Sequence, residues 1–112
     1  MLVPVLLRTN TLKSVKSRKI FMKYAHVPEY ILSYKDLNAT ERLLMGIIYS
    51  LTRMSGECFA TNEYFSNTLG FTTRTISSSI SSLKRENLIV TKNINGNRKI
   101  ILTEKFNNNV EK

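Results

Sequence analysis

The feature that most constrains the fold of this chain is a tight, glycine-containing turn between two short amphipathic segments. Leu69-Gly70-Phe71-Thr72 separates a stretch over about 62–68 from one over about 73–86, and both carry apolar residues at helical spacing. Gly70 suits the left-handed backbone with which helices commonly end, and Thr72 suits the N-cap of the next helix. The sequence therefore predicts two helices joined by a turn of a few residues.

A longer helix is predicted before this pair. Asn38-Ala39-Thr40-Glu41 has the pattern of a capping box, with Asn at the N-cap and Glu three residues later. Behind it, apolar residues recur at i, i+3, i+4 and i+7: Leu44, Ile47, Ile48 and Leu51. We expect a helix over about 39–53, ended by Ser55-Gly56.

A β-hairpin is predicted after the helices. Two runs rich in β-branched residues, 88–92 and 98–102, flank a segment that contains Asn95-Gly96. Asn-Gly between such runs is a strong hairpin signal, because both residues tolerate a positive φ.

Charge is unevenly distributed along the chain. The 112 residues include 17 basic and 8 acidic side chains, which gives a formal net charge of +9 with the single histidine neutral. Residues 1–23 carry six bases and no acid, residues 24–71 carry a net −2, and residues 72–103 carry a net +5. This asymmetry favours one face built for a polyanion.

Composition excludes several classes of protein. No apolar run approaches the ~20 residues that a membrane-spanning helix needs. One cysteine, Cys58, excludes an internal disulfide, and one histidine, His26, excludes a Cys/His zinc site built by a single chain. The sequence contains no phosphate loop, zinc-binding spacing or nucleophile motif, and its acids form no pair suited to acid–base catalysis. We expect a soluble, cytoplasmic protein with no enzymatic activity, no cofactor and no metal site.

The order of these signals is typical of a winged helix. The segment LNATERLLMGIIYSLTRMSGECFATNEYFSNTLGFTTRTISSSISSLKRENLIV resembles the winged helix domains of Gram-positive phage and plasmid proteins. These include replisome organisers, replication initiators, accessory proteins of conjugative transfer and small repressors. The resemblance implies DNA binding and an α+β winged helix-turn-helix fold, with a three-helix core and a C-terminal β-hairpin wing.

Three parts of the chain are expected to differ in organisation. Residues 24–103 form the winged helix domain. Residues 1–23 are either a basic flexible arm or a non-native extension, and their composition also fits a transit peptide. Residues 104–112, with three consecutive asparagines, are predicted to be a disordered tail.

The helix after the turn carries the first set of candidate DNA-binding residues. With Ile76, Ile80 and Leu83 inward, a step of about 100° per residue places hydroxyl and basic side chains on the opposite side. Short hydroxyls let a helix lie close to a duplex, and an arginine near its start can bond guanine through two hydrogen bonds. The candidates are Thr72, Thr73, Arg74, Ser77, Ser78, Ser81, Lys84 and Arg85.

A purely structural role for these residues is the alternative. The hydroxyl groups then serve as caps and solvent-facing positions, while Lys84 and Arg85 complement the helix dipole. Against this, serine is a mediocre helix former, so a run of serines weakens the helix without a benefit to folding.

The hairpin carries the second set of candidates. Cationic and amide side chains can lie along phosphates or enter a minor groove, where Asn and Arg read A·T-rich sequence. The candidates are Lys92, Asn95, Asn97, Arg98 and Lys99. If both sets neutralise about five phosphates, affinity falls with salt at a log–log slope of about −4 to −5.

Two hypotheses from different classes follow. The first is a double-stranded DNA-binding protein of a phage or plasmid, acting in replication, conjugative transfer or transcription control. The second is a protein-interaction module on the same scaffold, either a replisome adaptor or an inhibitor of a host nucleoprotein complex.

The expected partners follow from the first hypothesis. A homodimer is expected, since one module of this size makes a small interface of limited specificity. Replication or transfer proteins are further candidate partners, and a membrane is not. Apolar residues near the start of the domain either form the dimer contact or close the core: Val27, Tyr30, Ile31 and Leu32.

Overall fold

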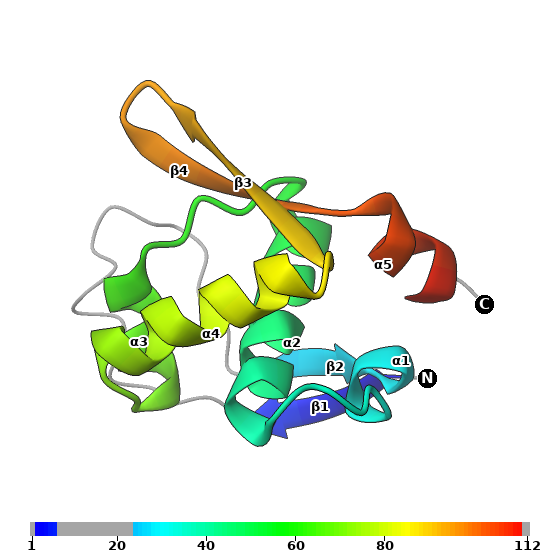
Figure 1. Cartoon of the computed structure of the whole chain (residues 1–112). Coiled ribbons are helices and arrows are strands. Elements are labelled where there is room, and N and C mark those ends of the chain that lie inside the picture. Colours follow the sequence, from blue (N-terminus) through cyan, green and yellow to red (C-terminus); the bar gives the residue numbers. More distant parts are fainter. Residues whose placement is uncertain (1, 7–23, 111–112) are drawn as a thin grey trace.

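The computed structural model describes residues 2–6 and 24–110, with a β-hairpin after the main helices (Figure 1). Helices α2 to α4 form the core, and the β3–β4 hairpin follows them, which confirms the predicted α+β fold class. In chain order the elements are β1 (Leu2–Leu6), β2 (Tyr24–Pro28), α1 (Glu29–Leu32), α2 (Ala39–Ser55), α3 (Asn62–Leu69), α4 (Thr73–Arg85), β3 (Ile89–Ile94), β4 (Asn97–Leu102) and α5 (Glu104–Val110).

Helix α2 is the central helix of the core. The backbone N–H of Glu41 donates to Asn38 Oδ1 (2.9 Å) and that of Asn38 donates to Glu41 Oε1 (3.0 Å), so the predicted capping box is formed. The last helical residue is Ser55, two residues beyond the predicted range, and Gly56, whose φ of 84° lies in the left-handed region, ends the helix as predicted. Of the predicted inward stripe, Leu44, Ile47 and Ile48 are fully buried, and Leu51 is half-buried.

Helices α3 and α4 meet at the predicted turn. Gly70, with a φ of 85°, ends α3, and the Thr72 hydroxyl accepts the backbone N–H of Thr75 (3.2 Å) at the start of α4. The hydroxyl of Ser66 donates to the carbonyl oxygen of Phe71 and braces the turn. Each helix matches its predicted range to within one residue, and α4 buries the predicted stripe: Ile76, Ile80 and Leu83.

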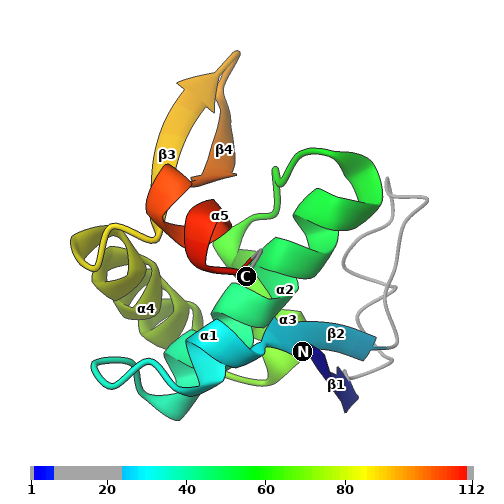
Figure 2. The same cartoon turned by 90° about the vertical axis from the view of Figure 1, so that its right-hand side faces the viewer.

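The β3–β4 hairpin projects beyond the helices in both views (Figures 1 and 2). Its turn uses Asn95 (φ 52°) and Gly96 (φ 81°), as the sequence predicted. The backbone N–H of Ile100 donates to the carbonyl oxygen of Cys58 (2.8 Å), which adds a short bridge from the segment after α2. This bridge fixes the middle of β4 to the segment after α2.

Strands β1 and β2 form a second antiparallel sheet, which the sequence did not predict. Leu2 lies opposite Pro28, and β2 packs against α2. The close approach depends on Gly46, because a Cβ there would lie 2.6 Å from Val27 Cγ2. For residues 2–6 the flexible-arm prediction is wrong, since the edge of β2 supplies a partner strand. The rest of that predicted arm, residue 1 and residues 7–23, lies outside the described residues.

The apolar residues considered for a dimer contact lie partly in the core. Val27 is 1% exposed and Ile31 is 0% exposed, so these two close the core and are wrong as dimer candidates. Tyr30 is half-buried, whereas Leu32 is 39% exposed. Within this group, only Leu32 therefore offers an apolar surface to a partner.

The prediction of a disordered tail is wrong for residues 104–110, which form helix α5. Phe106 is fully buried, and its ring centroid lies 5.5 Å from that of Tyr49 and 6.2 Å from that of Tyr30. The hydroxyl of Thr103 accepts the backbone N–H of Phe106 (3.2 Å) and caps the helix. The packed domain thus extends beyond the predicted boundary at residue 103, because burial of one aromatic ring outweighs poor local helix propensity.

A hydrogen-bonded cluster joins α5 to the end of α4. Lys105 Nζ donates to the hydroxyl of Tyr34 (2.8 Å) and to the carbonyl oxygen of Glu86 (2.9 Å), the C-cap residue of α4. The Tyr34 hydroxyl donates to Glu86 Oε1 (3.0 Å). Hydrogen bonding to Tyr34 raises the pKa of Lys105 above its ordinary value. This cluster ties the C-terminal end of α4 to the rest of the domain.

Candidate nucleic-acid interface

Helix α4 presents a polar face without an acidic residue. Its apolar side packs on α2 and α3, so the opposite side faces solvent. Ser79 is the exception among the serines, because it is 3% exposed and belongs to the buried side. All eight candidates of this segment are exposed: Thr72, Thr73, Arg74, Ser77, Ser78, Ser81, Lys84 and Arg85.

Basic groups lie at the two ends of this face. Arg74 is in the first turn of α4, where free backbone N–H groups also favour an anion. Lys84 and Arg85 are in the last turn, and Arg85 Nη2 donates to Ser82 Oγ (3.1 Å). The small serines between them leave the backbone accessible, so the face has the shape and charge to approach a phosphate backbone.

The tip of the hairpin supplies a second exposed polar surface. Lys92, Asn95 and Asn97 are all exposed, as is Asn93 beside them. Residues 87–103 contain no acid. Among the described residues, the wing therefore presents amides and one exposed cation, Lys92, while the exposed face of α4 carries three more cations.

Arg98 lies in a different environment from the one the sequence suggested. Its Nη1 donates to Asn62 Oδ1 (2.7 Å), and its Nη2 donates to the carbonyl oxygen of Ala60 (2.8 Å). Burial lowers the pKa of this guanidinium from its ordinary value. Both terminal nitrogens thus fasten β4 to the start of α3 and the segment before it, which makes Arg98 a structural residue although it lies one pair from the turn of the wing.

Lys99 is also engaged inside the protein. Its Nζ lies 2.8 Å from Glu57 Oε1, and the ammonium stands 6.0 Å from the ring centroid of Phe59. The side chain of Lys99 is 26% exposed. An ion pair with Glu57 leaves little net charge for a phosphate, so the two basic residues of β4, Arg98 and Lys99, add less positive charge to the wing than their number suggests.

Replacement of Arg98 should therefore reduce mainly the stability of the protein, and not its affinity for a ligand. We expect Arg98→Ala to lower the free energy of unfolding by about 1.5–3 kcal/mol, the cost of losing hydrogen bonds to a charged group. Arg98→Lys keeps the charge but cannot reach both acceptors, so it should also destabilise. Chemical denaturation of the three proteins tests this. Unchanged stability in both variants would contradict the structural role.

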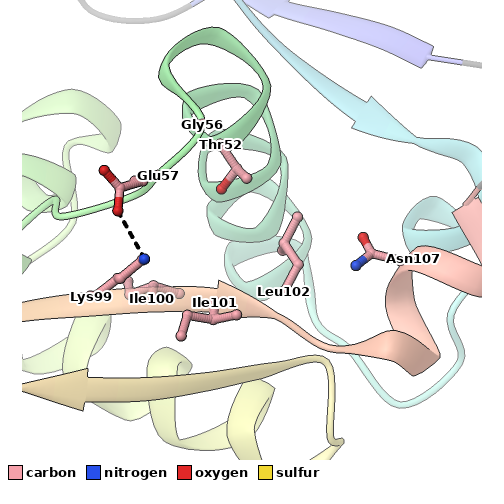
Figure 3. A pocket seen from close by; sticks show the side chains of 8 residues that line it. All are labelled: Thr52, Gly56, Glu57, Lys99, Ile100, Ile101, Leu102 and Asn107. Carbon is pink, nitrogen blue, oxygen red and sulfur yellow. Dashed lines mark ion pairs between the residues drawn. The ribbon is translucent and has the colours of Figure 1, made fainter.

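A hollow of about 260 Å³ opens beside β4, between the end of α2 and α5 (Figure 3). The Lys99–Glu57 ion pair stands at one side, and the other walls are mainly aliphatic or small. The lining residues are Thr52, Gly56, Glu57, Lys99, Ile100, Ile101, Leu102 and Asn107. These lining residues include one ion pair and no further charged group, which is typical of a gap between packed elements.

In the part of the chain that the structure describes, no three or more His, Cys, Asp and Glu side chains come together to hold a metal ion. Over the same residues, no helix is long and apolar enough to cross a membrane.

The core of three helices, the tight turn before α4 and the hairpin wing define a winged helix-turn-helix domain. Residues 35–89 match the family model described as a helix-turn-helix domain, from the loop before α2 to the first residue of β3. A helix-turn-helix domain supports DNA binding. Neither a curated protein nor a solved structure gives a significant match to the chain.

The partners of Arg98 and Lys99 are what sequence reasoning missed. Asn62 lies 36 residues before Arg98, and no local pattern links the two positions. Helical periodicity alone was enough to predict the exposed face of α4. The dipeptide Asn95-Gly96 alone was enough to predict the turn of the wing. The candidate interface is thus smaller than predicted, with its centre on α4 and the wing tip.

Proposed function

We propose that this protein binds double-stranded DNA through the exposed face of α4 and the tip of the wing. The acid-free face of α4, with Arg74 at its start, is the observation that carries this proposal. On B-DNA, α4 lies in the major groove and the wing lies along the neighbouring backbone or minor groove. The function is binding without catalysis.

The number of free cations sets the expected salt dependence. Of the six basic candidates on α4 and the wing, Arg98 and Lys99 are engaged internally, and four stay exposed for phosphates: Arg74, Lys84, Arg85 and Lys92. Four such contacts give a log–log slope of affinity against salt of about −3.5. This is shallower than the slope expected when all the wing bases take part.

We assign the protein to the replication, conjugative transfer or transcription control of a phage or plasmid. The likeness of its sequence to winged helix domains of such proteins supports this role. One domain makes a small interface, so a homodimer on paired half-sites is the arrangement that gives useful specificity. Leu32 is a candidate for the dimer contact because it is 39% exposed.

A protein-interaction module is the second candidate function. Val90 and Ile94 on the wing are 42% and 39% exposed, which would suit a contact with another protein. This alternative predicts that changes on α4 leave duplex binding unaltered. A replisome adaptor or an inhibitor of a nucleoprotein complex would act in this way.

Fluorescence anisotropy with labelled duplexes tiled across the DNA flanking the gene tests the proposal. We expect one tile to bind much more tightly than an unrelated duplex, and affinity to fall between about 50 and 200 mM salt. Arg74→Ala should cost about 1–3 kcal/mol of binding free energy, and Arg74→Lys should retain only the phosphate part of the contact.

Arg53→Ala is the matched control for Arg74→Ala. Arg53 is also an exposed arginine, but it lies in the last turn of α2, the helix against which the buried face of α4 packs. If both variants lose the same affinity for the duplex, binding depends only on the net charge of the protein. If Arg74→Ala binds the duplex as tightly as wild type, the exposed face of α4 is better explained as a contact with a protein partner.

A further inference from the structure

One side chain at the wing tip is apolar and therefore unsuited to a surface that contacts only phosphate groups. Ile94 is the single apolar residue in the run Lys92-Asn93-Ile94-Asn95-Gly96-Asn97, and it is 39% exposed. It is the last residue of β3, directly before the turn. A bulky aliphatic group is therefore held at the end of the hairpin, among amides and a lysine.

The position of Ile94 is fixed by the hairpin. Asn95 and Gly96 both have a positive φ, so the turn is the tight two-residue type, and Ile94 pairs directly with Asn97 across it. On β4, Arg98 lies directly after Asn97, and its two hydrogen bonds fasten the strand to the segment between α2 and α3 close to the turn. The bridge from Cys58 to Ile100 fastens the same strand at its middle. Six residues of strand carry the tip about 20 Å along the hairpin. The apolar group is presented on a rigid support.

We infer that Ile94 is a wedge that enters the minor groove and partly inserts between two base pairs, an inference that rests on the proposed DNA-binding function. Minor-groove proteins combine amide or cationic side chains with an aliphatic wedge that unstacks one base step and kinks the duplex. Asn95 and Asn97 supply the amides here, and Lys92, on the same face of β3 as Ile94, supplies the charge. Contact with stacked bases gives the exposed Ile94 side chain the burial that it lacks in the free protein.

The chemistry of the tip also predicts which steps the wedge selects. Asparagine amides suit the acceptors of A·T pairs, since the exocyclic amino group of guanine obstructs the floor of the minor groove at G·C pairs. Pyrimidine–purine steps, TA and CA/TG, unstack most easily. A TA step meets both conditions, whereas a CA/TG step contains one G·C pair and meets only the second. The wedge is therefore expected first at a TA step, and next at a CA/TG step, beside the half-site that α4 contacts. This adds sequence preference at positions that α4 does not reach.

Val90 provides a matched control on the same strand. It lies four residues before Ile94, so its side chain is on the same face of β3, and it is 42% exposed. It is closer to the base of the hairpin and lies opposite Ile101 rather than at the tip. Threonine keeps the β-branched shape that a strand favours, so Ile94→Thr and Val90→Thr change polarity with little effect on the hairpin.

Permanganate reactivity of thymines detects the wedge, because unstacked thymines are oxidised and both candidate steps contain thymine. The probe is the tightest-binding duplex from the tiling experiment, saturated with the full chain. We expect wild type and Val90→Thr to produce hyperreactive thymines at one step in the bound region. Ile94→Thr should lose that reactivity and bind about tenfold more weakly, the size of effect typical of one well-buried contact.

Each other outcome overturns the inference. If the bound wild-type protein produces no hyperreactive thymine, or if Ile94→Thr produces the same pattern as wild type, Ile94 is not a wedge although the protein binds DNA. If Val90→Thr weakens binding as much as Ile94→Thr, the whole face of β3 acts, as in a contact with another protein. If wild type binds no duplex, the proposed function itself fails.

Discussion

A glutamate at position 78 should abolish DNA binding without weakening the fold. Ser78 is exposed near the middle of the α4 face, between Arg74 and the basic residues of the last turn. Glutamate is a better helix former than serine, so Ser78→Glu should leave the free energy of unfolding equal or slightly higher. A carboxylate against phosphates costs several kcal/mol, and we expect affinity for the duplex to fall by about 100-fold or more.

Asn108→Glu separates this local effect from the change in net charge. Asn108 is an exposed residue of α5, so both variants lose one unit of positive charge. Anisotropy titrations at a single salt concentration compare them directly. We expect Asn108→Glu to lose only a small part of the affinity. If the two variants bind equally weakly, α4 is not the surface that contacts DNA.

The parts of the fold that were predicted are those that local sequence determines. The capping box of Asn38 and Glu41, the left-handed Gly70 and the Asn95-Gly96 turn each depend on residues a few positions apart. The inward stripe of α4 follows from a period of 3.6 residues. For the same reason the exposed face of α4 was predicted residue by residue.

The missed elements depend on contacts that are distant in sequence. The run of asparagines in α5 has low helix propensity, yet the helix forms because Phe106 packs against Tyr49 and Tyr30. The β1–β2 pair joins segments separated by residues 7–23, and no turn signal announces it. Such tertiary contacts override local preference and leave no pattern in a single sequence.

The site shows the same division between local and distant contacts. The number of basic residues in the hairpin does not indicate which of them are free to contact DNA. Lys92 is exposed, whereas Lys99 pairs with Glu57. Arg98 is the clearer case, since two hydrogen bonds to the segment before α3 make it part of the scaffold. The basic residues of the wing thus divide by strand: Arg98 and Lys99 on β4 are engaged inside the protein, whereas Lys92 on β3 remains exposed for DNA.

Truncation of Phe106 should cause the largest loss of stability among the changes considered. Its ring is fully buried between α1, α2 and α5, and its removal leaves a cavity that the surrounding aromatic rings cannot fill. Phe106→Ala should lower the free energy of unfolding by about 3–5 kcal/mol. For a domain whose total stability is about 5–15 kcal/mol, this change brings it close to unfolding.

The effect of Phe106→Ala should also reach the DNA-binding helix. Lys105 beside it donates to the carbonyl of Glu86 at the C-cap of α4, so loss of α5 releases the end that carries Lys84 and Arg85. Denaturant unfolding of Phe106→Ala, with Asn108→Ala as the exposed control on the same helix, measures the stability change. Hydrogen exchange of the last-turn amides of α4 then tests the coupling. A loss below about 1 kcal/mol would show that α5 is not packed, since buried Phe→Ala changes cost far more. Unchanged exchange at the end of α4 would show that α5 stabilises the core without holding the DNA-binding helix in place.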